Sequence, residues 1–296
     1  MFGKNKEEIR DLKPEHRRRR KESILPWGKK ERIFILVIFL GTVLASGLLA
    51  LSAENYKFSG LAKINFPKLS LNGLFKGETI VIGNKETPAD KIIKAFKNQT
   101  KDLTGTYAFE VIDLSTGASF GVNENQVIQA ASLIKLPLML YAQGKVSDAK
   151  IEAMGKRSDN AIFAELVAKF GQKTIQSYVD SLGMEETLLA ENTTTAKEIG
   201  NLFSKIYKDK EDKILGYLTD TIFEKWLRAG IPEEIRVAHK YGREVGVVND
   251  AGIIFSDQPF VLVIMSQGVN EEEADKVVPE LARMIYLEYA ESQNIR

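Results

Sequence analysis

The chain has 296 residues, 44% of them hydrophobic, with no cysteine and two histidines. The lack of cysteine excludes disulfides, thiolate nucleophiles and thiolate metal sites, and two histidines argue against a multi-histidine metal site. The net charge is +1, but residues 1–32 hold 12 Lys/Arg against 6 Asp/Glu, whereas the rest holds 29 against 34. The basic excess therefore belongs to the N-terminal tail, and nothing indicates a nucleic-acid-binding body.

An uncharged apolar run follows this tail. Residues 33–51 (IFILVIFLGTVLASGLLAL) form a stretch of 19 residues, long enough to cross a bilayer as a helix. The Arg/Lys cluster before the run, together with Trp27 at its edge, predicts a cytoplasmic N-terminus and an exported remainder. The alternative is a cleaved signal peptide, although its basic region would then be unusually long.

The sequence thus predicts a single-pass membrane protein with four regions. These are a basic cytoplasmic tail (1–32), a transmembrane helix (33–51), a stalk or linker (52–87) and an extracytoplasmic folded domain (88–296). Gly, Lys, Asn and Pro interrupt the short apolar pieces of the linker. The helical spacing of Ile92, Ile93 and Phe96 indicates where the folded domain begins.

Within this domain, hydrophobic periodicity predicts an alternation of strands and helices. A hairpin is expected over 106–129, with its turn at 115–117, and a pair of adjacent strands over 246–255 and 259–267. Helices are expected from Ser132 onward and over 149–170, 172–182, 194–209, 219–229 and 271–292. Such an order is typical of an α+β domain, in which an antiparallel sheet has helices segregated around it.

A serine and a lysine three positions apart lie in an apolar segment, AASLIKLPLML (130–140). On a helix, Ser132 and Lys135 share one face. A serine hydroxyl is a weak nucleophile that needs a base, and burial lowers the pKa of a lysine enough for its amine to serve. The pattern S-x-x-K is common, however, and a chance match with a snorkelling lysine is the alternative.

Two further short motifs follow in the chain. Ser158-Asp159-Asn160 lies in GKRSDNAIFAEL, where Ser158 could simply be the N-cap of a helix. Lys240-Tyr241-Gly242 lies in VAHKYGREVGVVNDAGIIF, where it could be the edge of a strand before a glycine turn. Each motif alone therefore has an ordinary structural interpretation.

Together and in this order, the three motifs resemble the S-x-x-K, S-D-N and K-T-G set of class A β-lactamases and penicillin-binding proteins. The stretches NTTTAKEIGNLF (192–203) and LRAGIPEEIRVAHKYG (227–242) are also similar to this family, and the resemblance covers roughly residues 88–292. It implies a β-lactamase/transpeptidase-like fold, with a five-stranded antiparallel sheet flanked by helices. The helical lobe is expected to be trimmed, because 25 residues lie between Ser132 and Ser158.

The resemblance also implies a serine hydrolase that opens β-lactam amide bonds through an acyl-enzyme, without a metal or an organic cofactor. Ser132 would be acylated and Lys135 would remove its proton. Ser158, supported by Lys240, would relay a proton to the leaving nitrogen. The substrate would be a β-lactam or a small peptidoglycan-derived molecule, and the catalytic domain is expected to be a monomer.

Substrate binding is expected along the third motif. The backbone N–H groups of Ser132 and Arg243 would form an oxyanion hole, and Lys240 and the Arg243 side chain would attract a substrate carboxylate. Asn160 would contact Lys135 and the substrate. Gly242 belongs to the same edge, and Tyr241, which replaces a small hydroxyl residue, is expected either to narrow the cleft or to point away from it.

The largest departure from the family concerns deacylation. Efficient lactamases carry an E-x-x-L-N loop whose glutamate activates water, but the matching region here, 182–196, is short and has Ala190 where asparagine is expected. Glu185, Glu186 and Glu191 are candidates, unless all three are solvated loop charges. His239 either tunes the neighbouring Lys240 or is an ordinary strand residue.

Two other functions therefore remain open. One is a penicillin-binding D-alanyl-D-alanine peptidase or esterase that deacylates slowly. The other is a non-catalytic cell-wall-binding module with the same fold.

Overall fold

The computed structural model describes residues 34, 36–43 and 86–293. Residues 34 and 36–43 are helical and belong to the predicted membrane span, whose other residues lie outside the described part. No helix among the described residues is both long and apolar enough to cross a membrane. The tail 1–32 and nearly all of the linker 52–87 also lie outside the described residues, so the assignments of these regions stay predictions.

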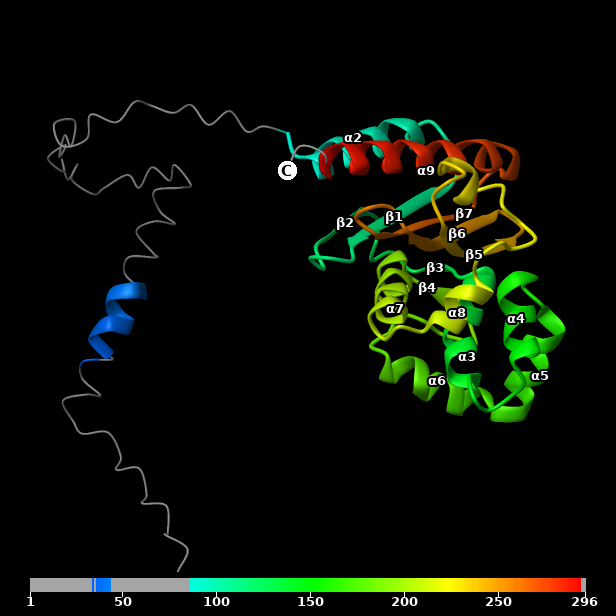
Figure 1. Ribbon diagram of the computed structural model, residues 1–296. Coiled ribbons are helices and arrows are strands. Elements are labelled where there is room, and N and C mark those ends of the chain that lie inside the picture. Colours follow the sequence, from blue (N-terminus) through cyan, green and yellow to red (C-terminus); the bar gives the residue numbers. More distant parts are fainter. Residues whose placement is uncertain (1–33, 35, 44–85, 294–296) are drawn as a thin grey trace, which may run out of the picture. The chain divides into compact units, whose positions relative to one another are not determined.

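A five-stranded antiparallel sheet forms the centre of the domain (Figure 1), as the sequence predicted. The strand order is β2-β1-β7-β6-β5. The strands are β1 (Thr106–Asp113), β2 (Ser119–Val122), β5 (Val237–Glu244), β6 (Val247–Ile254) and β7 (Phe260–Gln267). Strand β5 is an edge strand, and it carries the third sequence motif.

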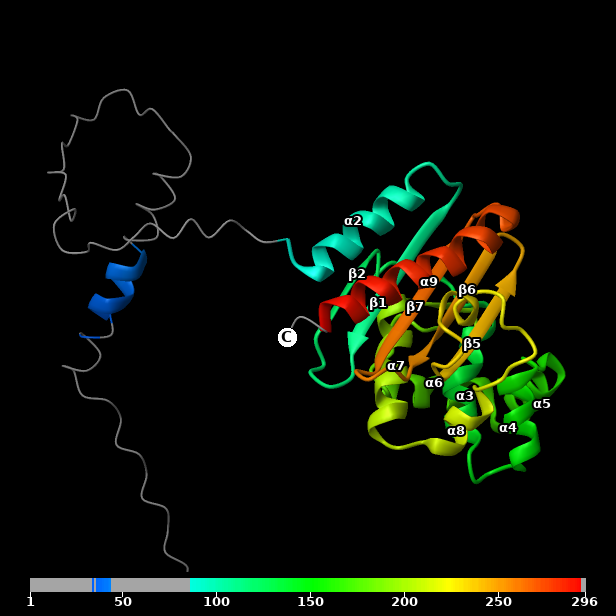
Figure 2. The ribbon, with the colours of Figure 1, turned by 45° about the horizontal axis from the view of Figure 1, so that its top comes forward.

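Helices cover both faces of the sheet. On one face lie α2 (Pro88–Thr100) and α9 (Glu271–Gln293), which run side by side across the strands (Figure 2). On the other face lies a helical lobe made of α3 (Lys135–Ala142), α4 (Asp148–Lys156), α5 (Asn160–Phe170), α6 (Gln172–Ser181), α7 (Ala196–Lys208) and α8 (Asp212–Tyr217).

Side chains along each strand alternate between the two faces of the sheet, so the sheet contributes to two hydrophobic cores, one on each face. In β7, Val261 and Val263 belong to the core shared with the helical lobe, whereas Leu262 and Ile264 belong to the core shared with α2 and α9. Successive strand residues point to opposite faces, so a strand with helices on both sides is apolar at nearly every position. The sheet thus holds the edge strand β5 through β6, its one neighbouring strand.

The helix predicted over 149–170 is interrupted. Residues Asp148–Lys156 form α4 and Asn160–Phe170 form α5, because Ser158 between them has a left-handed backbone with φ 55°. An L-residue in this conformation cannot continue a right-handed helix. The N-cap of α5 is Asp159, whose carboxylate accepts a hydrogen bond from the backbone N–H of Ile162 at 3.0 Å.

The helix predicted over 219–229 was wrong. That segment is irregular up to a 3-10 turn at Arg228–Gly230. The helix α8, which ends at Tyr217 just before this segment, was not predicted. Glu224 accepts hydrogen bonds from the backbone N–H of Thr221 at 2.6 Å and from its hydroxyl at 2.7 Å. Such local side-chain bonds compete with helix formation. The short strands β3 (Ile128–Gln129) and β4 (Thr193–Thr194) were missed because two residues show no periodicity.

Candidate active site

Ser132 lies in a 3-10 helix, Ala131–Ile134, that leads into α3. Lys135 begins α3, and its Nζ lies 2.6 Å from the Oγ of Ser132 and 2.7 Å from the Oδ1 of Asn160 on α5. The Lys135 side chain is buried, with 3% of its surface exposed. The amine is therefore held between a hydroxyl and an amide oxygen, out of contact with bulk water.

Burial changes the proton affinity of this amine. Desolvation lowers the pKa of Lys135 to about 8, although the negative charges of Glu244 and Asp159 oppose the shift. Loss of water disfavours the ammonium form, and the pKa of the amine therefore falls. About a tenth of Lys135 is consequently neutral at pH 7, and a neutral amine can accept the proton of the neighbouring Ser132 hydroxyl.

A second lysine and serine lie beside the first pair. Lys240 on β5 is fully buried, and its Nζ donates to the Oγ of Ser158 at 2.9 Å and to the carbonyl oxygen of Tyr241 at 2.7 Å. Desolvation and the nearby charge of Lys135 hold the pKa of Lys240 well below its ordinary value. Two amines with weakened proton affinity, each bonded to a serine hydroxyl, thus lie close enough for the charge of one to affect the other.

Close packing of β5 positions the nucleophile. Gly242 lies against the 3-10 helix, and a Cβ placed on it would come within 2.8 Å of the backbone nitrogen of Ser132. No side chain fits there, so glycine is required for the strand edge to reach the serine. The side chain of Asn249 on β6 donates to the carbonyl oxygens of Gln129 at 2.8 Å and Ala130 at 3.2 Å, which ties the segment before Ser132 to the sheet.

Two residues near the site have backbones that are rare for L-amino acids. Ala131, next to the nucleophile, has φ 48°, and Ser158 has φ 55°. Left-handed conformations of non-glycine residues persist when surrounding contacts hold them, and they cluster at functional sites. Here they set the directions of the two serine hydroxyls toward the two amines.

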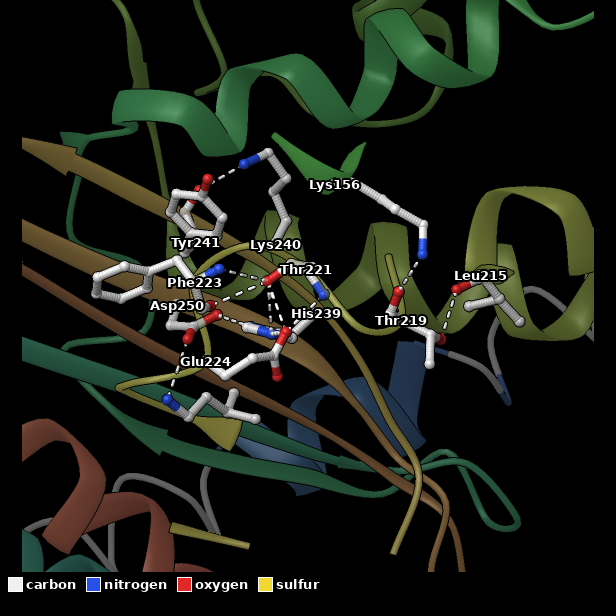
Figure 3. Close-up of polar contacts among 11 residues, drawn as sticks. Lys156, Leu215, Thr219, Thr221, Phe223, Glu224, His239, Lys240, Tyr241 and Asp250 are labelled. Atoms are coloured by element: carbon white, nitrogen blue, oxygen red, sulfur yellow. Dashed lines mark hydrogen bonds and ion pairs between the residues drawn. The ribbon is translucent and has the colours of Figure 1, made fainter. Parts of the chain in front are cut away.

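Tyr241 and Arg243 point to the other face of the sheet. The Tyr241 ring lies 5.1 Å from the ring of Phe223 (Figure 3), and the Arg243 guanidinium pairs with Glu271 of α9 at 2.7 Å and with Asp275 at 3.4 Å. Strand alternation explains this, since Lys240 and Gly242 occupy the opposite face. The Tyr241 ring also lies 4.2 Å from the Nζ of Lys240, so it stays beside this site residue. The pairing of the Arg243 side chain gives no support to its predicted role as a carboxylate ligand.

His239 belongs to a buried polar cluster behind Lys240 (Figure 3). Its Nδ1 lies 2.8 Å from Asp250 and its Nε2 lies 3.3 Å from Glu224. Burial alone would lower the pKa of His239, but Asp250 and Glu224 raise it to about 9. The imidazole is therefore a protonated structural cation at neutral pH, and as a cation it cannot serve as a general base there.

The short loop 182–196 places its acidic side chains away from this chemistry. Glu185, Glu186 and Glu191 are all exposed. The carboxylate that organises the loop is Glu198 of α7, which accepts from the backbone N–H of Glu186 at 2.8 Å and from the hydroxyl of Thr187 at 2.6 Å. The three predicted candidates are thus solvent-facing, as the alternative interpretation expected.

Sequence reasoning missed two polar residues at the site. Glu244 lies at the end of β5, where its carboxylate accepts hydrogen bonds from the side-chain amides of Gln129 and, at 2.9 Å, Asn192. Asn192 also accepts a hydrogen bond from the backbone N–H of Ala130 at 2.7 Å. Lys240, Gly242 and Glu244 alternate along one strand, and this spacing could have placed Glu244 on the same face as the site.

Comparison with solved structures defines the class of fold. The structure of PBP-A matches with a TM-score of 0.62 and 21% identity, covering 71% of this chain and 97% of that one. An ancestral class A β-lactamase matches with a TM-score of 0.61 and 18% identity, covering 66% and 99%. A β-lactamase from Sphaerobacter thermophilus gives 0.59 and 18%, covering 68% and 96%. The domain therefore has the α+β fold of class A β-lactamases and related penicillin-binding proteins.

The family follows from the sequence itself. The model of the Beta-lactamase enzyme family matches residues 88–153 and 150–289, and the chain belongs to this family. No curated protein sequence matches the chain. The family and the fold support a serine β-lactamase-like function.

Proposed function

We propose that the protein is a serine hydrolase that opens the amide bond of β-lactams through an acyl-enzyme on Ser132. The observation that carries this proposal is the 2.6 Å contact between Ser132 Oγ and the buried amine of Lys135. An amine with a pKa near 8 can do the work for which imidazole is more common. His239, the one imidazole among the described residues, is held in an ion-pair cluster instead.

Acylation begins when neutral Lys135 accepts the proton of the Ser132 hydroxyl. The oxygen then bonds to the lactam carbonyl carbon, and the amide C–N bond breaks. Ser158 donates its proton to the leaving nitrogen and recovers one from the neighbouring amines, since Lys240 Nζ lies 2.9 Å from its Oγ. The negative oxygen that forms in between would be stabilised by the backbone N–H groups of Ser132 and Arg243. The close approach of Gly242, the neighbour of Arg243, to the Ser132 nitrogen supports this role.

Substrate orientation would come from the same strand edge. Lys240 supplies positive charge for a substrate carboxylate, and Asn160, whose Oδ1 accepts from Lys135, has an amide group left to contact the substrate. The pairing of the Arg243 side chain with Glu271 leaves its main chain as its contribution. No step in this scheme uses a metal or an organic cofactor.

A second candidate is a penicillin-binding peptidase or esterase of the D-alanyl-D-alanine type that deacylates slowly. The exposed positions of Glu185, Glu186 and Glu191 favour it, because none of them is held near the acyl group to activate water. A PBP-A variant is described as an acyl-enzyme complex with penicillin G, and it matches with a TM-score of 0.60 and 21% identity. The two candidates share acylation and differ in how long the acyl-enzyme lasts.

Incubation with a fluorescent penicillin, followed by denaturing electrophoresis over time, tests the proposal. A label that forms on the wild-type protein, is absent from Ser132→Ala, and disappears within seconds supports the hydrolase. A label that persists for hours supports the slow binder. Folded wild-type protein that never becomes labelled would instead indicate the non-catalytic cell-wall-binding module.

We also propose that residues 33–51 anchor the protein in the cytoplasmic membrane, with residues 1–32 inside and the catalytic domain outside. The support is the uncharged run of 19 residues and the basic excess before it. Membrane fractionation and protease digestion of intact cells test this assignment. Digestion of the catalytic domain from outside, with a protected tail, is expected; release of the whole domain into the medium would indicate a cleaved signal peptide.

A further inference from the structure

The face of β5 that meets the nucleophile ends in a carboxylate. Lys240, Gly242 and Glu244 alternate onto the same face of the strand, and Gly242 is the position that touches Ser132. Glu244 is two residues further along, so its side chain projects from the same side, about 7 Å beyond Gly242. Glu244 is also the first of the two acidic residues that oppose the lowering of the Lys135 pKa, which places its charge within reach of the amine.

Asn192 fixes this carboxylate beside the nucleophile. The Nδ2 of Asn192 donates to Glu244 at 2.9 Å, while the Asn192 carbonyl oxygen accepts from Ala130, two residues before Ser132, at 2.7 Å. Asn192 has a left-handed backbone with φ 53°, which allows both contacts at once. The loop 182–196 is thereby joined both to β5 and to the segment that carries the serine.

The orientation of the Asn192 amide is determined by this pairing. A carboxylate only accepts hydrogen bonds, so the amide nitrogen must face Glu244 and the Oδ1 must point elsewhere. That Oδ1 is buried, and no donor among the described residues reaches it. A buried carbonyl oxygen of this kind normally accepts a hydrogen bond from a protein group or from water. The Asn192 oxygen and the Glu244 carboxylate thus belong to two side chains that are bonded to each other beside the segment that carries Ser132.

We propose that Glu244 is the general base of deacylation and that Asn192 positions the water that it activates. The inference rests on the proposed acyl-enzyme at Ser132. It assigns to a strand residue the work that the resemblance assigns to a loop glutamate. Glu244 is exposed, as the loop glutamates are, and its bond to Asn192 beside the serine segment distinguishes it from them.

The deacylation step balances without any further reactant. The water oxygen bonds to the acyl carbon while its proton passes to the Glu244 carboxylate. The bond between the acyl carbon and Ser132 Oγ then breaks, and the proton is returned to Oγ. The products are free Ser132 and the carboxylic acid of the opened substrate.

The test compares acylation and deacylation in Glu244→Gln, which keeps the size of the side chain and one of its two acceptor oxygens but cannot accept the proton. Acylation by a fluorescent penicillin should not slow, because the Glu244 charge raises the Lys135 pKa and its removal leaves more of the amine neutral. Deacylation should slow about 10²-fold or more, the range that a general base contributes. Glu244→Asp should restore part of the lost rate, and Asn192→Ala should slow deacylation while leaving acylation in place.

Glu124→Gln is the matched control. Glu124 is a half-buried glutamate that accepts a hydrogen bond from the side-chain amide of Asn125 at 2.7 Å, so its replacement weakens the same kind of carboxylate–amide pair. It should deacylate like the wild type. Thermal melting of each variant separates a loss of loop packing from a loss of chemistry, because Glu244→Gln and Asn192→Ala both weaken the bonds around Glu244 but only Glu244→Gln removes the base.

Different results separate the failure of this inference from the failure of the proposed function. A Glu244→Gln enzyme that acylates and deacylates like the wild type overturns the role of Glu244 while the acyl-enzyme stands. A wild-type acyl-enzyme that lasts for hours also overturns the role of Glu244 and leaves the acyl-enzyme in place. Wild-type protein that shows no adduct at Ser132 overturns both.

Discussion

The backbone nitrogen of Ser132 faces Gly242 so closely that a single added carbon on Gly242 would come within 2.8 Å of it. These residues are 110 positions apart in the sequence and belong to the helical lobe and the sheet. Their contact holds the serine against the edge of β5, with the amines of Lys135 and Lys240 nearby. The proposed acylation depends more on this contact than on the residue types of the first or the third motif taken alone.

The first prediction concerns Gly242→Ala. The added Cβ must push the 3-10 helix away from β5, which should cost about 1–3 kcal/mol of stability. A displacement of about 1 Å in a reacting group can cost roughly 10²-fold in rate, so acylation should fall by about this factor. Thermal unfolding and the rate of penicillin labelling measure the two effects.

Gly216→Ala provides the control for this variant. A Cβ at Gly216 on α8 would meet nothing within 4 Å, and alanine is the better helix former. This variant should be as active as the wild type and at least as stable. Equal activity of both variants would show that the contact between Gly242 and Ser132 does not position the nucleophile.

The second prediction concerns the pH dependence of acylation. Lys135 accepts a proton only as a neutral amine, and its pKa is lowered to about 8. The acylation rate should therefore rise by about tenfold for each pH unit below 8 and level off above it. Second-order labelling rates between pH 5.5 and 9 measure this profile. A rate that stays constant from pH 6 to pH 8 would exclude Lys135 as the base.

The third prediction concerns the stability that His239 contributes. Its pKa is raised from 6.5 to about 9 in the folded protein by Asp250 and Glu224, in spite of burial. The folded state thus holds a proton that the unfolded state loses above pH 6.5, so the contribution is complete below pH 6.5 and disappears as the pH rises through 9. The expected loss of unfolding free energy is roughly 3 kcal/mol.

Denaturant unfolding at several pH values measures this loss, and NMR titration gives the pKa directly. His16 is the other histidine of the chain, so His16→Gln leaves a single imidazole to follow. The lowered pKa of Lys135 acts with the opposite sign, but only above about pH 8. An imidazole that titrates at or below 6.5 would contradict the assignment of His239 as a buried cation.

Much of this fold and part of the site follow from the sequence. The strands β6 and β7 and the helices α6, α7 and α9 are long and periodic, and they were predicted within a few residues. The irregular path around Thr221 could not be predicted, because the bonds between Thr221 and Glu224 override helical spacing locally. Likewise, the left-handed backbone of Ser158 is held by tertiary contacts and not by its own preference.

The same distinction applies to the site. Ser132 and Lys135 are near in sequence, so helical geometry alone predicts their contact. Strand alternation places Arg243 on the face opposite Lys240, where it meets Glu271, and this could have been read from the sequence. The pairing of Glu244 with Asn192 could not, since the two residues come from distant segments with no shared motif.

The most direct test of the central claim maps the adduct of penicillin by mass spectrometry in the wild type and in Lys135→Arg. Arginine keeps the positive charge but does not become neutral in proteins, so it cannot accept the serine proton. Lys145→Arg, at an exposed lysine, is the control. The account predicts an adduct on Ser132 in the wild type and the control, and acylation of Lys135→Arg slower by about 10²–10⁴-fold. An adduct on another residue, or acylation of Lys135→Arg at the wild-type rate, would contradict it.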